Sequence, residues 1–253
     1  MNGVLAAVSG LVLGSFLNVL IHRLPRNESP WRGRSRCPSC SRPVRWYENV
    51  PLVSFLGLGG RCAGCRCRIP WRYPAVELAT ALLAVACLHR FGADAAALGY
   101  FLFLAALLAI AWIDWQHLLI PDELSLGALG LGLVLASTVL PVGPLGAAAG
   151  VVAGAGFVWG VAALYKAVRG IEGMGFGDVK LAGMIGAFLG PAPVLLTIFV
   201  AAFLGSLYGI LLVFRGGTRQ SKVAFGTFLA AGAALCLFFG EALALWYSAL
   251  LRR

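Results

Sequence analysis

The chain has 253 residues, of which 60% are hydrophobic and 12% are charged, and its formal net charge is +10. A soluble domain of this length carries about twice that share of charged residues, so the composition excludes an ordinary soluble protein. We therefore expect an all-α membrane protein that crosses the bilayer several times.

Eight apolar segments are candidate membrane helices. The first ends in Arg23 without a small-residue cleavage site, so we interpret it as a transmembrane helix and not as a signal peptide. The sixth is the shortest, and about 20 Å of helix cannot cross a hydrocarbon core of about 30 Å. The eight expected segments are 3–21, 74–88, 96–113, 123–140, 145–165, 179–189, 194–214 and 223–250.

Small residues recur at four-residue spacing in the first and fifth segments, which is typical of faces where membrane helices approach closely. In the first segment the row continues with Asn18, so a role in a substrate groove is an alternative to simple packing. The small residues are Gly10 and Gly14 in the first segment, and Gly146, Gly150 and Gly154 in the fifth.

Residues 23–72 form a basic segment that contains 11 of the 20 Lys and Arg residues. The positive-inside rule therefore places this segment in the cytosol and the N-terminus outside. A basic segment can also bind nucleic acid. Retention in the cytosol and contact with anionic membrane lipids explain the charge more simply, so no nucleic-acid partner is expected.

The same segment contains two Cys-x-x-Cys pairs, 25 positions apart, and a tryptophan follows each pair at the same offset. This pattern indicates a repeated turn whose four thiolates suit a tetrahedral, structural zinc site. A reducing cytosol argues against disulfides, and a module with so few aliphatic residues needs the metal to fold. Cys67 is a competing ligand. The expected ligands are Cys37, Cys40, Cys62 and Cys65.

Most of the ten acids have ordinary structural explanations. Glu77 follows Pro74, and we expect it in the first turn of the second membrane helix, where a carboxylate interacts favourably with the helix dipole. Asp122 follows Pro121, and we expect it to cap the fourth helix.

Asp114 and Asp178 are different, because each lies where the chain enters or leaves an apolar segment, and acids in such places usually mark function. The dipole of its own helix opposes a charge on Asp114 and favours one on Asp178. A charged and a protonated carboxyl together suit acid–base chemistry. We therefore expect a catalytic aspartic dyad with the charge on Asp178, where Gly175 and Gly177 let a substrate backbone approach.

Taken together, these motifs resemble those of bacterial prepilin peptidases, also called type IV leader peptidases. Gly-Phe-Gly-Asp at 175–178 is similar to the Gly-x-Gly-Asp signature of intramembrane aspartic proteases. By this resemblance the catalytic pair falls on Asp114 and Asp178. The likeness also covers residues 14–19, the four cysteines, residues 46–51 and residues 72–77.

The resemblance implies cleavage of the short basic leader of type IV prepilins or type II secretion pseudopilins. Cleavage would follow a glycine at the cytosolic face of the bacterial inner membrane. The resemblance also implies methylation of the new N-terminal residue with S-adenosylmethionine as methyl donor. We divide the chain into a first helix (1–22), a zinc module (23–72) and a peptidase bundle (73–253).

Two other functions are compatible with parts of this pattern. A proton- or ion-coupled transporter with a zinc-ribbon module also uses membrane acids and glycine bends, although no inverted repeat is evident in the sequence. A zinc ribbon that binds nucleic acid or a protein partner from a membrane anchor would leave Asp114 and Asp178 unexplained.

Overall fold

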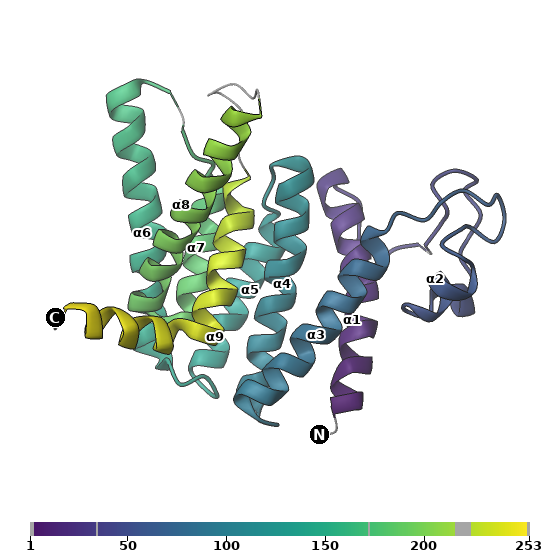
Figure 1. The fold of residues 1–253 in the computed structure, drawn as a ribbon, viewed down its shortest axis with the longest axis horizontal. Coiled ribbons are helices and arrows are strands. Elements are labelled where there is room, and N and C mark those ends of the chain that lie inside the picture. The colour runs from purple at the N-terminus through teal and green to yellow at the C-terminus, as the bar shows by residue number, and fades with distance from the viewer. Residues whose placement is uncertain (1–2, 34, 172, 216–223, 252–253) are drawn as a thin grey trace. The chain divides into compact units, whose positions relative to one another are not determined.

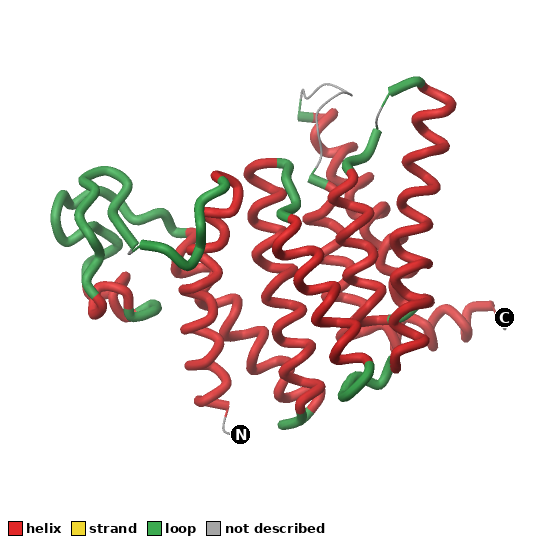
Figure 2. The backbone as a smooth tube through the Cα atoms, turned by 180° about the vertical axis from the view of Figure 1, so that it is seen from behind, coloured by secondary structure: helices red, strands yellow, loops and turns green. Residues whose placement is uncertain are grey.

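The computed structural model describes residues 3–33, 35–171, 173–215 and 224–251. Within these residues it contains helices and two isolated β-bridges but no strand (Figure 2). Arg34, which belongs to the basic segment, and Val223, at the start of the eighth expected membrane helix, lie outside the described residues.

Each of the eight expected membrane segments coincides with a described helix, which confirms the all-α fold class (Figure 1). Among the described residues, five helices are long and apolar enough to cross a membrane, namely α1, α3, α4, α6 and α8. The eight helices are α1 (Gly3–Arg23), α3 (Arg72–Phe91), α4 (Ala95–His117), α5 (Asp122–Ala136), α6 (Gly143–Arg169), α7 (Phe176–Leu189), α8 (Pro191–Phe214) and α9 (Phe225–Leu251).

The chain divides into two compact units, Met1–Ala109 and Ile110–Arg253, and the boundary lies inside α4. In the first unit, α1 and α3 pack side by side (Figure 1). A Cβ atom added at Gly10 would lie 2.6 Å from Cα of Ala81, and one added at Gly14 would lie 2.7 Å from Cα of Glu77. The two helices are therefore antiparallel, and the predicted packing face on α1 is confirmed.

Most of the cysteine-containing segment between α1 and α3 is loop (Figure 2). It also contains the 3₁₀ helices η1 (Leu24–Arg26) and η2 (Trp46–Asn49) and the short helix α2 (Val53–Gly57). The isolated bridges join Arg36 to Pro43 and Arg61 to Arg68. In each turn the first cysteine donates its N–H to the carbonyl five residues later, at 3.0 Å and 2.9 Å. The same backbone turn therefore occurs twice, as the repeated pattern predicts.

In the second unit, α7 is the central helix and contacts α5, α6, α8 and α9. A Cβ atom added at Gly150 of α6 would lie 2.1 Å from the carbonyl oxygen of Gly186, so the two backbones touch. Because α7 is enclosed by protein, it does not need to span the bilayer alone, which explains its short length. Its fully buried side chains are Leu181, Ala182, Met184, Ile185, Ala187 and Phe188.

Candidate active site and metal centre

The second unit brings Asp114 and Asp178 together. Asp114 lies in the last turn of α4, and Asp178 lies in the first turn of α7, three residues after the N-cap residue Gly175. Both acids are buried, with 5% and 9% of their surface exposed, and the Asp114 carboxyl acts electrostatically on Asp178. The structure therefore contains two buried, interacting carboxyl groups, which is the arrangement that acid–base chemistry on a peptide bond requires.

Asp114 is held by the N-terminus of α9. The backbone N–H of Thr227 donates to Oδ2 of Asp114 at 2.8 Å. The Thr227 hydroxyl donates to the carbonyl of Ala111 at 3.1 Å, and its oxygen lies 3.3 Å from Oδ2 of Asp114. A backbone N–H in the first turn of a helix stabilises an ionised carboxylate. The sequence argument considered only the dipole of α4, and the contact with α9 favours the charge on Asp114 instead.

Ile120 packs against glycines beside these acids. A Cβ atom added at Gly177 would lie 3.0 Å from Cβ of Ile120. One added at Gly226 would lie 2.8 Å from Cδ1 of Ile120 and 2.9 Å from Oδ2 of Asp114. A side chain at either position would therefore have to displace Ile120, and one at Gly226 would also press on the Asp114 carboxyl. Sequence reasoning singled out Gly177 but missed Gly226 and Thr227, whose neighbours carry no recognisable motif.

Asp122 does not cap α5, so that prediction was wrong. Pro121 occupies the N-cap position, and no side chain caps the helix. Both carboxylate oxygens of Asp122 accept hydrogen bonds from Nζ of Lys180, at 2.6 Å and 2.7 Å. Lys180 lies two residues after Asp178, and its ammonium lies 5.1 Å from the centre of the Phe176 ring. The ion pair therefore joins α5 to α7 beside the candidate site.

Glu77 is not in the first turn of its helix, so that prediction was also wrong. The helix α3 begins at Arg72, two residues before Pro74, because proline is tolerated in the first turn. Glu77 is buried, and its Oε2 accepts the backbone N–H of Leu52 at 2.8 Å. Glu77 therefore contacts the cysteine-containing segment and does not lie among the first-turn N–H groups of its own helix.

The four predicted cysteine ligands converge. Their sulfur atoms all lie within 4.8 Å of one another, so the cluster can hold a metal ion such as zinc. The sulfurs of Cys37 and Cys65 are 3.8 Å apart, and tetrahedral zinc with bonds of ~2.3 Å places its sulfurs ~3.8 Å apart. The pKa of the Cys37 thiol is lowered to about 6, mainly by the backbone N–H of Cys40, which favours its thiolate form. Burial and the neighbouring thiols raise the pKa of the Cys40 thiol to about 11. Cys67 lies outside this group of four, although its sulfur is 3.5 Å from that of Cys37.

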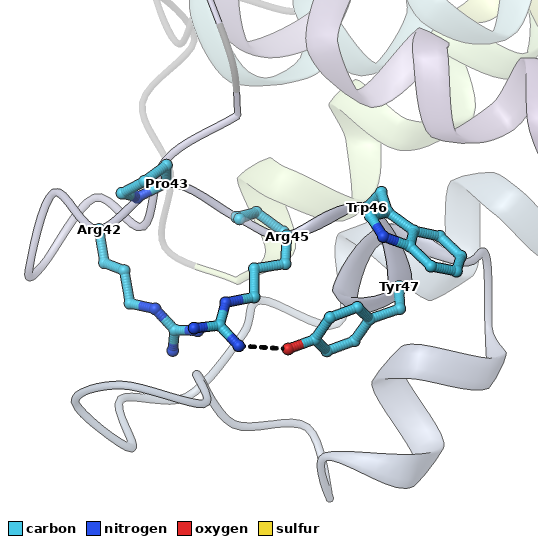
Figure 3. A pocket seen from close by; sticks show the side chains of 6 residues that line it. Arg42, Pro43, Arg45, Trp46 and Tyr47 are labelled. Carbon is cyan, nitrogen blue, oxygen red and sulfur yellow. Dashed lines mark hydrogen bonds between the residues drawn. The ribbon is translucent and has the colours of Figure 1, made fainter.

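A basic and aromatic surface follows the first cysteine turn. Residues 42–47 line an open depression of about 400 Å³ (Figure 3). Nη1 of Arg45 donates to the hydroxyl oxygen of Tyr47 at 2.6 Å, and the neighbouring Trp46 ring is 79% exposed. None of these six residues is buried. The charge and the exposed ring suit contact with anionic lipid headgroups better than enclosure of a small ligand.

Two family models match the chain. The model of the bacterial peptidase A24 N-terminal domain matches residues 8–91. The model of the type IV leader peptidase family matches residues 101–210, which include both buried acids. The first match lies wholly within the first compact unit.

Relatives match over most of the chain and share the name prepilin leader peptidase/N-methyltransferase. The protein from Burkholderia pseudomallei strain K96243 is 40% identical over 261 residues, which cover 93% of this chain and 84% of the relative. The protein from Pseudomonas aeruginosa PAO1 is 38% identical over 256 residues, with coverages of 92% and 88%. The protein from Aeromonas hydrophila is 36% identical over 264 residues, with coverages of 94% and 90%. No solved structure matches the chain.

Proposed function

The chain belongs to the type IV leader peptidase family, and we propose that it is a membrane aspartic endopeptidase that also methylates its product. The substrates are type IV prepilins or type II secretion pseudopilins, whose short basic leader is removed after a glycine. The shared name of the relatives supports both activities, whereas the comparisons give no support to a transporter. The observation that carries the peptidase activity is the buried, interacting pair Asp114 and Asp178.

In this mechanism Asp114 is the ionised acid, because the Thr227 N–H stabilises its carboxylate. Asp178 lies beside that charge and keeps its proton, since two close carboxylates do not both ionise readily. Asp114 takes a proton from the attacking water, while Asp178 donates a hydrogen bond to the scissile carbonyl oxygen. Asp114 then returns the proton to the leaving nitrogen. This assignment of the charge is opposite to the one expected from the helix dipoles alone.

The chain is a membrane protein, and we place it in the bacterial inner membrane with its N-terminus outside. The dyad and the cysteine module then face the cytosol, where the prepilin leader is accessible. Gly175 gives the substrate backbone access to Asp178, since a Cβ atom added at Gly175 would meet no atom closer than 3.7 Å. The space beside Gly177, in contrast, is filled by Ile120. A structural zinc ion is held by the four cysteines whose sulfur positions suit it, namely Cys37, Cys40, Cys62 and Cys65. S-adenosylmethionine is a co-substrate that supplies an electrophilic methyl group.

One experiment tests both activities. The purified protein is incubated in liposomes with a prepilin and S-adenosylmethionine, and both fragments are weighed by mass spectrometry. We expect cleavage after the leader glycine and the mass of one added methyl group on the mature fragment. An absence of cleavage, together with acid-dependent ion flux across the liposome membrane, would instead support a transporter.

A further inference from the structure

Glu77 is a buried carboxylate that the peptidase mechanism does not use. It is 8% exposed and lies within residues 8–91, the part of the chain matched by the N-terminal family model. Its Oε2 accepts a hydrogen bond from the Leu52 backbone N–H at 2.8 Å. In the described part of the chain, no Lys or Arg forms an ion pair with Glu77. A buried acid without a cation is costly to keep charged, which suggests that its cation comes from a ligand.

The side-chain oxygen of Asn18 is a second buried acceptor. Asn18 lies on α1 one helical turn after Gly14, the residue that contacts Glu77. Asn18 is 2% exposed, and its Nδ2 donates to the carbonyls of Gly14 and Tyr73 at 3.3 Å and 3.1 Å. These two bonds fix the amide orientation, and Oδ1 has no partner among the described residues. A Cβ atom added at Gly14 would lie 2.7 Å from Cα of Glu77, and Asn18 follows Gly14 by about 6 Å of rise along α1, so both residues belong to the α1–α3 interface. An unsatisfied buried acceptor in such a place needs an explanation.

The backbone N–H that donates to the Glu77 carboxylate belongs to Leu52, which lies in a strained turn. Leu52 has φ 57° and ψ −46°, and the N–H of Val53 donates to the carbonyl of Pro51 at 2.6 Å. This is a γ-turn of the rare, strained form. Strain of this kind is usually found at functional sites. The Leu52 N–H can be replaced by a stronger donor, because an ammonium group bonds to a carboxylate more strongly than an uncharged N–H does.

We propose that Glu77 and Asn18 bind the α-amine that leader cleavage exposes on the pilin. An ammonium group is a donor without acceptors, and it therefore complements a carboxylate and an unpaired amide oxygen. The inference rests on the proposed function, because it names the part of the chain that receives the cleaved product for methylation.

Glu77 takes the proton that this amine must lose before it can be methylated. The nitrogen lone pair then forms a bond to the methyl group of the sulfonium donor, the carbon–sulfur bond breaks, and its electron pair stays on sulfur. The methylated amine leaves as an ammonium ion, and Glu77 returns its proton to water. General base catalysis of this kind contributes a factor of roughly 10²–10⁴ to a rate.

The test uses Glu77→Gln in the full-length protein, since glutamine keeps an acceptor oxygen for the Leu52 N–H but cannot take a proton. Glu48→Gln is the matched control. Glu48 also accepts a backbone N–H, that of Arg45 at 2.9 Å, but it is already paired with Arg42 at 2.7 Å. We expect Glu77→Gln to methylate a pre-cleaved pilin at least about 100-fold more slowly, with leader cleavage changed less than about threefold. Glu48→Gln should change neither rate by more than about threefold.

Peptide binding gives a second measurement. A synthetic membrane-spanning peptide that begins with phenylalanine is compared, with a free amine and N-acetylated, for binding to the protein in liposomes. The wild type should prefer the free amine by about tenfold or more, and Glu77→Gln should lose this preference while Glu48→Gln keeps it. A normal methylation rate or an unchanged amine preference in Glu77→Gln would overturn the inference.

Two further outcomes are distinguishable. If Glu77→Gln also loses cleavage or bound metal, Asn18→Ala is tested in its place, because this variant removes the unpaired oxygen and leaves Glu77 unchanged. An unchanged preference of Asn18→Ala for the free amine would overturn the inference. A wild type that cleaves prepilin and methylates nothing would contradict the proposed methyltransferase function. In that case a wild type that prefers the free amine would still support the amine site, and a wild type without this preference would refute it.

Discussion

At the scale of single residues, the buried acids are tested most directly by amide substitution. Asp114→Asn and Asp178→Asn keep the side-chain shape but cannot ionise, so we expect leader cleavage to fall at least about 100-fold in each. Asp122→Asn is the control, because Asp122 is exposed and its ion pair with Lys180 contributes little; its cleavage rate should stay within about tenfold. Rates of leader release in liposomes give the comparison. Near-normal turnover in either buried-acid variant would contradict the dyad.

The contact between Thr227 and Asp114 leads to a second prediction. Thr227→Ala removes the hydroxyl but keeps the N–H that donates to Asp114, so kcat/KM should fall less than about tenfold. Thr227→Pro removes that N–H, and proline is tolerated here because Thr227 lies in the first turn of α9. Loss of a hydrogen bond to a charged group should lower kcat/KM by about 10- to 100-fold. Equal activities for the two variants would show that the N–H does not position Asp114.

The sequence identifies Asp114 and Asp178 because acids are rare in a chain this apolar. Thr227 could not be predicted in the same way. It acts through its backbone N–H, a group that nearly every residue has, and it lies 113 positions from its partner. The charge assignment from helix dipoles likewise considered only each acid's own helix, whereas the N–H that donates to Asp114 belongs to α9. Long-range backbone contacts of this kind need the folded chain.

At the scale of helices, α6 packs closely against the C-terminal end of α7. A Cβ atom at Gly150 would lie 2.1 Å from a backbone atom of α7, whereas one at Gly156, on the same helix, would meet nothing within 4 Å. Gly150→Ala should therefore destabilise the protein by about 1–3 kcal/mol or more. Gly156→Ala should be neutral or stabilising by up to about 1 kcal/mol. Thermal unfolding in detergent measures both, and similar melting temperatures for the two variants would contradict the close contact.

The cysteine turns give a prediction about metal. Purified protein should contain zinc, and Cys37→Ser combined with Cys40→Ser should remove it, because serine is a poor ligand for this metal. An aspartic mechanism needs no metal, so a chelator should not stop peptide hydrolysis directly. Elemental analysis and thiol alkylation test this. Freshly purified protein that has no zinc and four alkylatable thiols would disprove the site.

Element positions were predictable because apolar length and helix-breaking residues are local properties. The partners of Glu77 and Asp122 were not, although both lie near helix starts that the sequence reveals. A cap or a dipole was the simplest local explanation for each. In the structure, Leu52 and Lys180 from other elements bind them instead. Tertiary contacts therefore decided the role of both acids.

At the scale of the whole chain, the compact units differ from the division into residues 1–22, 23–72 and 73–253. The helix α3 belongs to the unit Met1–Ala109, because glycines of α1 bring the two backbones into contact. Hydropathy alone cannot show this, because the apolar sequence of α3 is equally compatible with packing in the peptidase bundle and with packing against α1. The first family model, 8–91, includes α1 from residue 8, the cysteine segment and α3.

This division leads to the last prediction, that the two activities can be separated by substitution. The dyad belongs to the second unit, whereas the cysteine cluster and Glu77 belong to the first. Asp114→Asn should therefore still methylate a pilin that has already been cleaved, since methylation does not use the dyad. Cys37→Ser combined with Cys40→Ser should lose methylation more severely than cleavage, because loss of the metal disturbs the first unit. Mass spectrometry of intact and pre-cleaved pilin measures both rates in each variant. Equal loss of both activities in the cysteine variant, with the helices of the second unit still folded, would indicate one shared site and contradict the separation.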